Sequence, residues 1–148
     1  MSGLITFVVA VACAISCGTI KLQEAAPAAP KTLQDGEYAI VFTFPDAPED
    51  RRTVSHKIRF KVDPKTGKIE GELLRSFDGK SEPSLPVHGL AKGTTLKFAI
   101  SDVEDGALLT FHFSGKLTDA DNASGSFIIL RDLKVLDTGT WDVTKSKK

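Results

Sequence analysis

Cysteine is scarce in this sequence, and its position limits the chemistry of the chain. The 148 residues contain two cysteines, Cys13 and Cys17, both near the amino terminus. The body of the chain therefore has no disulfide framework, no cysteine-ligated metal and no catalytic thiol. Net charge is also lacking, because 19 basic side chains balance 19 acidic ones. Without a field of one sign to attract polyanions, we expect no nucleic-acid partner.

The motifs that identify common active sites are absent as well. The sequence has no Gly-x-Ser-x-Gly elbow, no glycine-rich phosphate loop and no His-Glu-x-x-His pair. Its histidines, His56, His88 and His112, fall on separate predicted strands without a partner at metal-ligand spacing. Residues 119–125 resemble part of a calcium loop but lack the closing glutamate, which favours a hairpin turn. We therefore expect no enzyme activity, no metal site and no cofactor.

An uncharged amino-terminal segment predicts export. Residues 3–20 carry no charged side chain, and their apolar centre, residues 4–15, is shorter than the roughly 20 residues of a membrane-spanning helix. A small residue precedes each of Cys13 and Cys17, which resembles the lipobox of bacterial lipoproteins. Lipidation of either cysteine and ordinary cleavage both remain open. We expect a leader over residues 1–17 and a protein that is periplasmic, membrane-anchored as a lipoprotein, or extracellular.

A spacer rich in alanine and proline follows the leader. Residues 18–32 include the run Ala25-Ala-Pro-Ala-Ala-Pro30, which buries little surface and favours an extended chain. Such a spacer is suited to separate a leader or lipid anchor from a folded domain. We expect that domain over residues 33–148, with membrane contact only through the leader or a lipid.

The body of the chain alternates apolar and polar residues, and no segment sustains the helical period of 3.6. The clearest case is residues 54–63, where every second residue from Val54 to Val62 faces one side. A turn over residues 63–68 with one proline and one glycine follows, and residues 68–75 then form the hairpin partner. The pattern predicts an antiparallel β-hairpin.

Similar segments continue to the end of the chain. Further strands are expected over residues 38–44, 85–90, 96–100, 109–113, 125–129 and 135–143, with a polar loop over residues 77–83. Seven or eight strands in sequence predict an all-β antiparallel meander whose apolar face must be hidden. Closure into a small barrel hides that face and removes the edges of the sheet. A β-sandwich is the alternative.

Two short motifs at the ends of this meander resemble a known family. Gly36-Glu37-Tyr38 resembles the Gly-x-Trp opening of lipocalin-type (calycin) barrels, with tyrosine in place of tryptophan. Gly139-Thr140-Trp141 is similar to the Gly-Thr-Trp endings of small secreted bacterial β-barrel domains. Lipocalins also have a basic residue on the last strand that covers the first-strand aromatic ring, and Lys145 is its nearest counterpart. The resemblance implies an up-and-down barrel with Lys145 over Tyr38.

Large rings dominate the face that would line this barrel. They are Phe42, Phe44, Phe60, Phe98, Phe111, Phe113 and Trp141. The interior of an eight-stranded barrel is wide enough either to be filled by side chains or to hold one small ligand. A binding module for a small hydrophobic ligand would have an open mouth and a cavity of at least ~300 Å³. A structural or protein-interaction domain of the cell envelope would be filled and would expose an apolar patch.

The candidate ligand residues are Tyr38, His56, Phe60, Arg75 and Phe111. In a hairpin centred on residues 65–66, the numbers of two paired residues sum to about 131, which places Arg75 opposite His56. A guanidinium beside an imidazole at the barrel mouth would suit the carboxylate of a fatty-acid-like ligand. The alternative is that Arg75 extends into solvent. Tyr38 is expected at the same end.

Overall fold

The computed structural model describes residues 32–147 of the chain. The predicted leader, most of the spacer, and Cys13 and Cys17 lie outside the described residues. Within 32–147 the elements are β1 (Gly36–Thr43), the 3-10 helix η1 (Glu49–Arg51), β2 (Thr53–Val62), β3 (Lys68–Leu74), β4 (Ser76–Phe77), β5 (Lys80–Ser81), β6 (Leu85–Lys92), β7 (Thr95–Glu104), β8 (Ala107–Leu117), β9 (Asn122–Arg131) and β10 (Lys134–Lys145). No helix in this range is long and apolar enough to cross a membrane.

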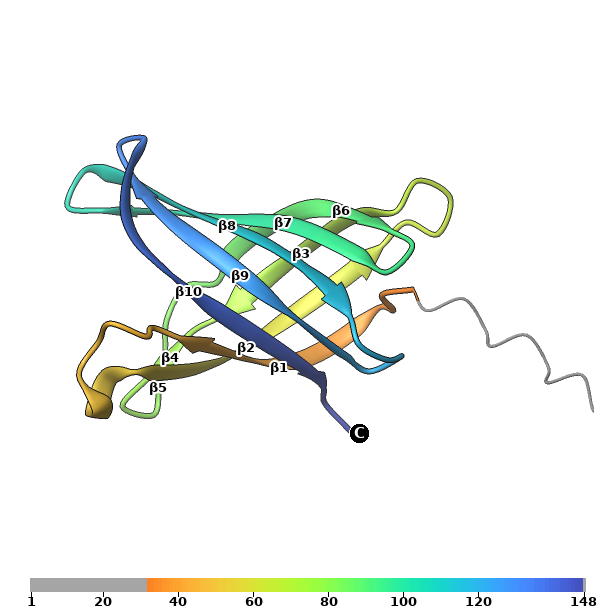
Figure 1. Ribbon diagram of the computed structural model, residues 1–148, viewed down its shortest axis with the longest axis horizontal. Coiled ribbons are helices and arrows are strands. Elements are labelled where there is room, and N and C mark those ends of the chain that lie inside the picture. The colour runs from red at the N-terminus through yellow and green to blue at the C-terminus, as the bar shows by residue number, and fades with distance from the viewer. Residues whose placement is uncertain (1–31, 148) are drawn as a thin grey trace, which may run out of the picture.

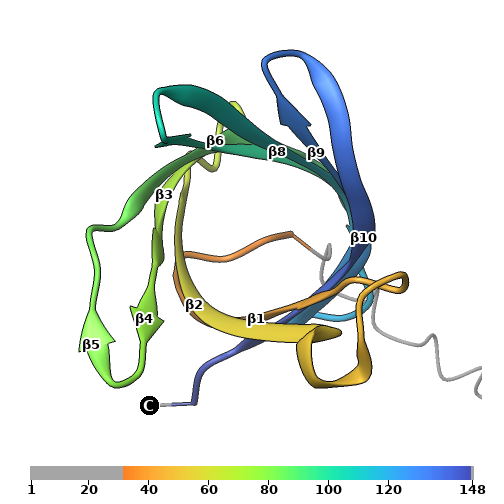
Figure 2. The same cartoon turned by 90° about the vertical axis from the view of Figure 1, so that its left-hand side faces the viewer.

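Eight of these strands form a closed antiparallel barrel, which confirms the predicted meander and its closure (Figure 1). The order around the barrel is β1-β10-β9-β8-β7-β6-β3-β2. β1 closes the sheet because it pairs with both β2 and β10. The barrel sheet therefore has no free edge that could pair with another chain. Figure 2, turned by 90°, shows the strands encircling a common interior.

The hairpin of β2 and β3 shows how local sequence sets the register. Asp63 Oδ1 accepts a hydrogen bond from the Lys65 amide at 2.8 Å, and Gly67 adopts a φ of +73°. A glycine suits this left-handed position because it has no Cβ. The turn pairs Lys57 with Leu74, as the predicted register requires. Alternate residues of both strands consequently face the interior together.

Aromatic side chains fill most of the barrel. The rings of Phe98 and Phe113 stack with centroids 4.5 Å apart, and Trp141 meets Phe98 edge to face at 5.3 Å. Trp141 is fully buried, which confirms its predicted place in the core, and its Nε1 donates to the Ser126 carbonyl at 3.0 Å. Gly115 makes room for this ring, since a Cβ there would lie 2.5 Å from Trp141 Cζ2. The interior is thus a packed core over most of its length.

Residues before β1 and at the end of β10 cover one end of the barrel. Leu33 is buried in the core cluster ahead of β1. Tyr38 is buried as well, and its hydroxyl donates to the Gln34 carbonyl at 3.0 Å. Lys145 pairs with Tyr38 across the closing strands, and its Nζ lies 5.9 Å from the centroid of that ring. A cation in this position interacts favourably with the ring face.

The segment expected as a polar loop, residues 77–83, is partly regular. β4 and β5 form a small hairpin in which Phe77 pairs with Lys80. Asp78 and Gly79 have φ values of +48° and +74°, which are typical of the two central residues of a type I′ turn. The prediction of a plain loop is wrong, because an Asp-Gly pair favours the two-residue turn of a β-hairpin.

Candidate functional site

A pocket opens at the end of the barrel where β1 ends and β2 begins, the end that faces the viewer in Figure 2. Its volume is about 170 Å³. Its wall is largely apolar and includes Phe42, Phe44, Leu73, Leu85, Ile100 and Phe111. Three polar or charged side chains complete the lining: His56, Arg75 and Asp102. An apolar pocket with a few convergent polar groups is the usual form of a small-molecule site.

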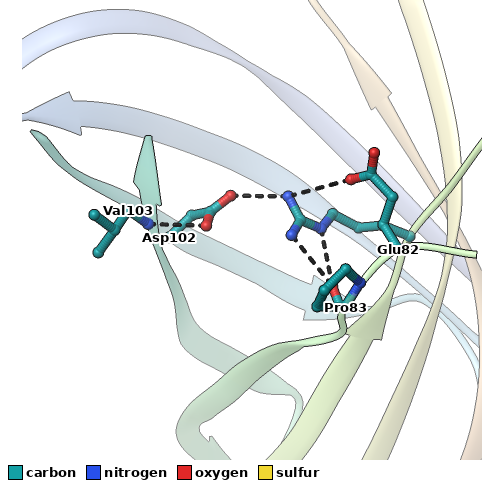
Figure 3. A network of polar contacts seen from close by, with 5 residues as sticks. Glu82, Pro83, Asp102 and Val103 are labelled. Atoms are coloured by element: carbon teal, nitrogen blue, oxygen red, sulfur yellow. Dashed lines mark hydrogen bonds and ion pairs between the residues drawn. The ribbon is translucent and has the colours of Figure 1, made fainter. Parts of the chain in front are cut away.

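Arg75, directly after β3, is held by two carboxylates and a carbonyl. Figure 3 labels the residues that supply them, Asp102, Glu82 and Pro83, around the guanidinium. Its Nη1 donates to Asp102 Oδ2 at 2.9 Å and lies 3.9 Å from Glu82 Oε2. Its Nε and Nη2 each donate to the Pro83 carbonyl at 3.2 Å. The Arg75 side chain is 20% exposed, so it neither extends into solvent nor presents a free guanidinium. The alternative in which Arg75 extends into solvent is therefore wrong, because Asp102 faces the same end of the interior and compensates the guanidinium.

His56 lies on β2 between two aromatic rings. Its ring centroid is 5.5 Å from that of Phe77 and 6.1 Å from that of Phe42. Its Nδ1 is buried and has no hydrogen-bond partner within residues 32–147. Burial, and then the positive charge of Arg75, lower the pKa of His56 below its ordinary value of 6.5, while Glu82 acts in the opposite direction. The imidazole is therefore neutral at pH 7 and has one unsatisfied buried nitrogen.

The structure brings together three of the five candidate ligand residues. His56, Arg75 and Phe111 line the pocket, whereas Tyr38 and Phe60 do not. Tyr38 pairs with Ile58, two residues after His56 on β2. The rings of Tyr38 and Phe60 pack together with centroids 5.4 Å apart. β1 and β2 are antiparallel, so the start of one strand lies at the opposite end from the start of the other. The expectation that Tyr38 lies at the same end as His56 is corrected for this reason.

Asp102 and Phe77, which the structure places in the pocket wall, were not among the candidate ligand residues. Asp102 continues the inward alternation of Leu96, Phe98 and Ile100 along β7, and a carboxylate on an apolar face was the available signal. Phe77 belongs to the β4–β5 hairpin, and its ring packs edge to face against the imidazole of β2. The Asp-Gly turn could have predicted the hairpin. Nothing local in the sequence predicts that the hairpin lies against β2.

The pocket is smaller than the cavity expected for a binding module. A drug-sized ligand requires at least ~300 Å³, whereas this pocket has about 170 Å³. A cavity of about 150 Å³ lined by leucine, isoleucine and phenylalanine is large enough to take up benzene. The pocket thus has the size of one ring or a short branched chain. A long fatty-acid chain does not fit inside it.

The other two histidines lie on the outside of the barrel. His88 and His112 flank Ala99 in one row across β6, β7 and β8, beside a shallow hollow of the outer wall. Within the described range no three histidine, cysteine or acidic side chains gather in a way that could hold a metal ion. Asp119 forms a hairpin turn, as expected, because its Oδ1 accepts a hydrogen bond from the Asp121 amide at 2.8 Å.

Comparisons of the chain with protein-family models, with curated proteins and with solved structures find no match. The functional conclusion therefore depends on the geometry of the pocket and of the surfaces beside it.

Proposed function

We propose that this domain is a binding module that takes a small hydrophobic ligand, about one ring in size, into the open end of its barrel. The observation that carries the proposal is the pocket of about 170 Å³ at the barrel mouth, with its aromatic and aliphatic wall and its few polar groups. Burial of a ring in such a pocket is favourable because it removes apolar surface from water. The function proposed is binding without catalysis or a cofactor.

The proposal includes a family and a location. The closed antiparallel barrel of eight strands and the contact of Lys145 with Tyr38 support a lipocalin-like domain. The uncharged residues 4–15 and the Ala/Pro spacer support export of the chain. The domain would then act in the periplasm, at a membrane through a lipidated Cys13 or Cys17, or outside the cell.

Nuclear magnetic resonance titration with a one-ring compound tests this function. Benzyl alcohol should shift the methyl signals of Leu73, Leu85 and Ile100 in a saturable way, because these side chains line the pocket. Phe77→Ala should weaken binding because it removes a ring of the pocket wall. Leu90→Ala is the matched control: Phe77 and Leu90 are 50% and 49% exposed, but Leu90 lies on the outer wall. Absence of any saturable shift in the wild-type protein would overturn the proposal.

A second candidate function is a protein-interaction domain of the cell envelope, and the hairpin tips favour it. Five large apolar side chains are exposed on the β7–β8 and β9–β10 hairpins: Val103, Leu108, Leu133, Val135 and Leu136. Leu133 is 89% exposed and has a φ of +66°, in the left-handed region that favours glycine or asparagine. An apolar side chain that is both strained and exposed supports a role in contact with a partner.

The charges at the tips of these hairpins, residues 103–108 and 131–137, define the chemistry of that partner. There the acidic residues Glu104, Asp105, Asp132 and Asp137 outnumber the basic residues Arg131 and Lys134. A protein surface with basic residues around an apolar patch therefore fits best. A labelled amphipathic peptide of leucine and lysine should bind in a fluorescence anisotropy titration, and Leu133→Ser should weaken it. Equal binding of a leucine–glutamate peptide, or an unchanged affinity in Leu133→Ser, would refute this function.

A further inference from the structure

The polar groups of the pocket define the class of its ligand, and this step rests on the proposed function. We propose that the pocket selects a neutral one-ring ligand with a hydroxyl group that hydrogen-bonds to His56, and that it rejects carboxylates. The inference reverses the sequence-based expectation of a fatty-acid headgroup at Arg75. It depends on three observations: the compensation of Arg75, the unsatisfied nitrogen of His56 and the volume of the pocket.

Arg75 already binds two carboxylates and a carbonyl, which makes it a poor site for the carboxylate of a ligand. Its guanidinium already contacts Asp102 at 2.9 Å, Glu82 at 3.9 Å and the Pro83 carbonyl at 3.2 Å (Figure 3). Two carboxylates thus surround one guanidinium, and the group as a whole carries a net negative charge. An anionic ligand would have to displace Asp102 or remain beside it, and either arrangement is unfavourable.

His56 provides the polar contact that the pocket still lacks. The imidazole lines the pocket, with the rings of Phe42 and Phe77 on its flanks. Its Nδ1 is unpartnered and enclosed, so a ligand hydroxyl reaches this atom once the ring turns about its Cβ–Cγ bond. A neutral imidazole nitrogen either donates or accepts a hydrogen bond, depending on the tautomer, and a hydroxyl group can complement both cases. A ligand hydroxyl therefore satisfies this nitrogen without introducing a charge. An ammonium group would gain one bond and some attraction from the two carboxylates around Arg75, but it would lose its hydration in a pocket whose wall is largely apolar.

The volume and the apolar wall of the pocket determine the size and the shape of the apolar part of the ligand. About 170 Å³ holds one six-membered ring and a short substituent. The rings of Phe44 and Phe111 and the branched side chains of Leu73 and Ile100 offer apolar contacts on several sides. Benzyl alcohol, phenol and small cyclic alcohols have this combination of one ring and one hydroxyl group.

A matched panel of four compounds tests the inference with the wild-type protein: toluene, benzyl alcohol, benzoate and benzylammonium. We expect the dissociation constant of benzyl alcohol to be at least about tenfold lower than those of the two ions, because an ion must be desolvated to enter. Tighter binding of benzoate or of benzylammonium would overturn the selection rule while leaving the binding function intact. If no compound of the panel binds, the proposed function itself fails.

Two variants separate the roles of the polar side chains. In His56→Leu, benzyl alcohol should lose about 3- to 10-fold in affinity relative to toluene, the value of one net hydrogen bond. An unchanged ratio would refute the contact with His56. Asp102→Asn removes the nearer of the two carboxylates and leaves Arg75 with Glu82 alone, at 3.9 Å, so it should raise the affinity for benzoate by about 10-fold or more. Circular dichroism establishes that each variant is folded. If Asp102→Asn fails to fold, the inference is still tested by the wild-type panel and by the affinity of His56→Leu for benzyl alcohol relative to toluene.

Discussion

Replacing Trp141 with alanine tests whether the packed interior stabilises the barrel. Trp141 is completely buried, stacks edge to face on Phe98 at 5.3 Å, and donates a hydrogen bond to the Ser126 carbonyl at 3.0 Å. Gly115 lies against the Trp141 ring and has no side chain that could fill the space left by the ring in Trp141→Ala. The substitution therefore leaves a cavity in the middle of the barrel.

The expected loss is large compared with the stability of a domain of this size. Truncation of a buried tryptophan costs about 3–5 kcal/mol in the free energy of unfolding. Small domains have about 5–15 kcal/mol in total. For a domain of this size each kcal/mol lost lowers Tm by about 3–5 °C, so the expected decrease in Tm is about 9–25 °C.

Urea unfolding followed by circular dichroism measures this loss, because Trp141 is the only tryptophan and the variant has no indole fluorescence. Ile128→Ala on the outer wall is the control and should change the free energy of unfolding by less than about 0.5 kcal/mol. In the wild-type protein the tryptophan emission should be blue-shifted. A loss below about 1 kcal/mol, or emission typical of indole in water, would show that the core assignment of Trp141 is mistaken.

Three further predictions concern the backbone, pH and a hairpin tip. Gly115→Ala would place a Cβ 2.5 Å from Trp141 Cζ2 and should destabilise the barrel by about 1–3 kcal/mol; an unchanged urea midpoint would contradict the close packing seen here. Because burial and Arg75 lower the pKa of His56 in the folded state, the unfolded chain binds more protons below pH 6.5. Stability should therefore decrease as the pH falls from 6.5 towards the folded-state pKa, and His56→Gln should remove that part of the dependence; parallel stability–pH profiles would argue against it. Leu133→Gly should stabilise the protein by about 0.5–1 kcal/mol, since it relieves a φ of +66° at an exposed position; a lower Tm would mean that Leu133 makes stabilising contacts.

Much of the fold could be predicted because it depends on local patterns. Strands alternate with a period of two, so residues 54–62 identify their own inward face. The turn at Asp63 then fixes which residues of β2 and β3 face each other, and Lys57 pairs with Leu74 as hairpin counting requires. Closure into a barrel was one of two ways to cover the apolar face, the other being a β-sandwich, and the pairing of β1 with β10 decides for the barrel.

The candidate site could be predicted only in part. His56 and Arg75 belong to one hairpin, so their shared position at the mouth follows from counting residues across a single turn. Asp102 lies on β7, and its contact with Arg75 requires the curvature of the whole barrel, which brings β3 and β7 together at their ends although β6 stands between them. The sequence predicted the wrong end of the barrel for Tyr38. Its position along the barrel axis relative to His56 depends on the register of β1 with β2, which a long loop separates.

The class of fold, the inward face of the regular strands, the burial of Trp141 and the absence of cysteine chemistry from the body of the chain could all be predicted from the sequence. These properties depend on residue type and on separations of a few positions, which the polypeptide transmits through local backbone geometry. The closed barrel was needed to show that Arg75 is paired with two carboxylates, that His56 has an unsatisfied nitrogen and that the pocket holds about 170 Å³. Charge compensation and cavity volume are sums over side chains from distant strands, so they exist only once the barrel has closed.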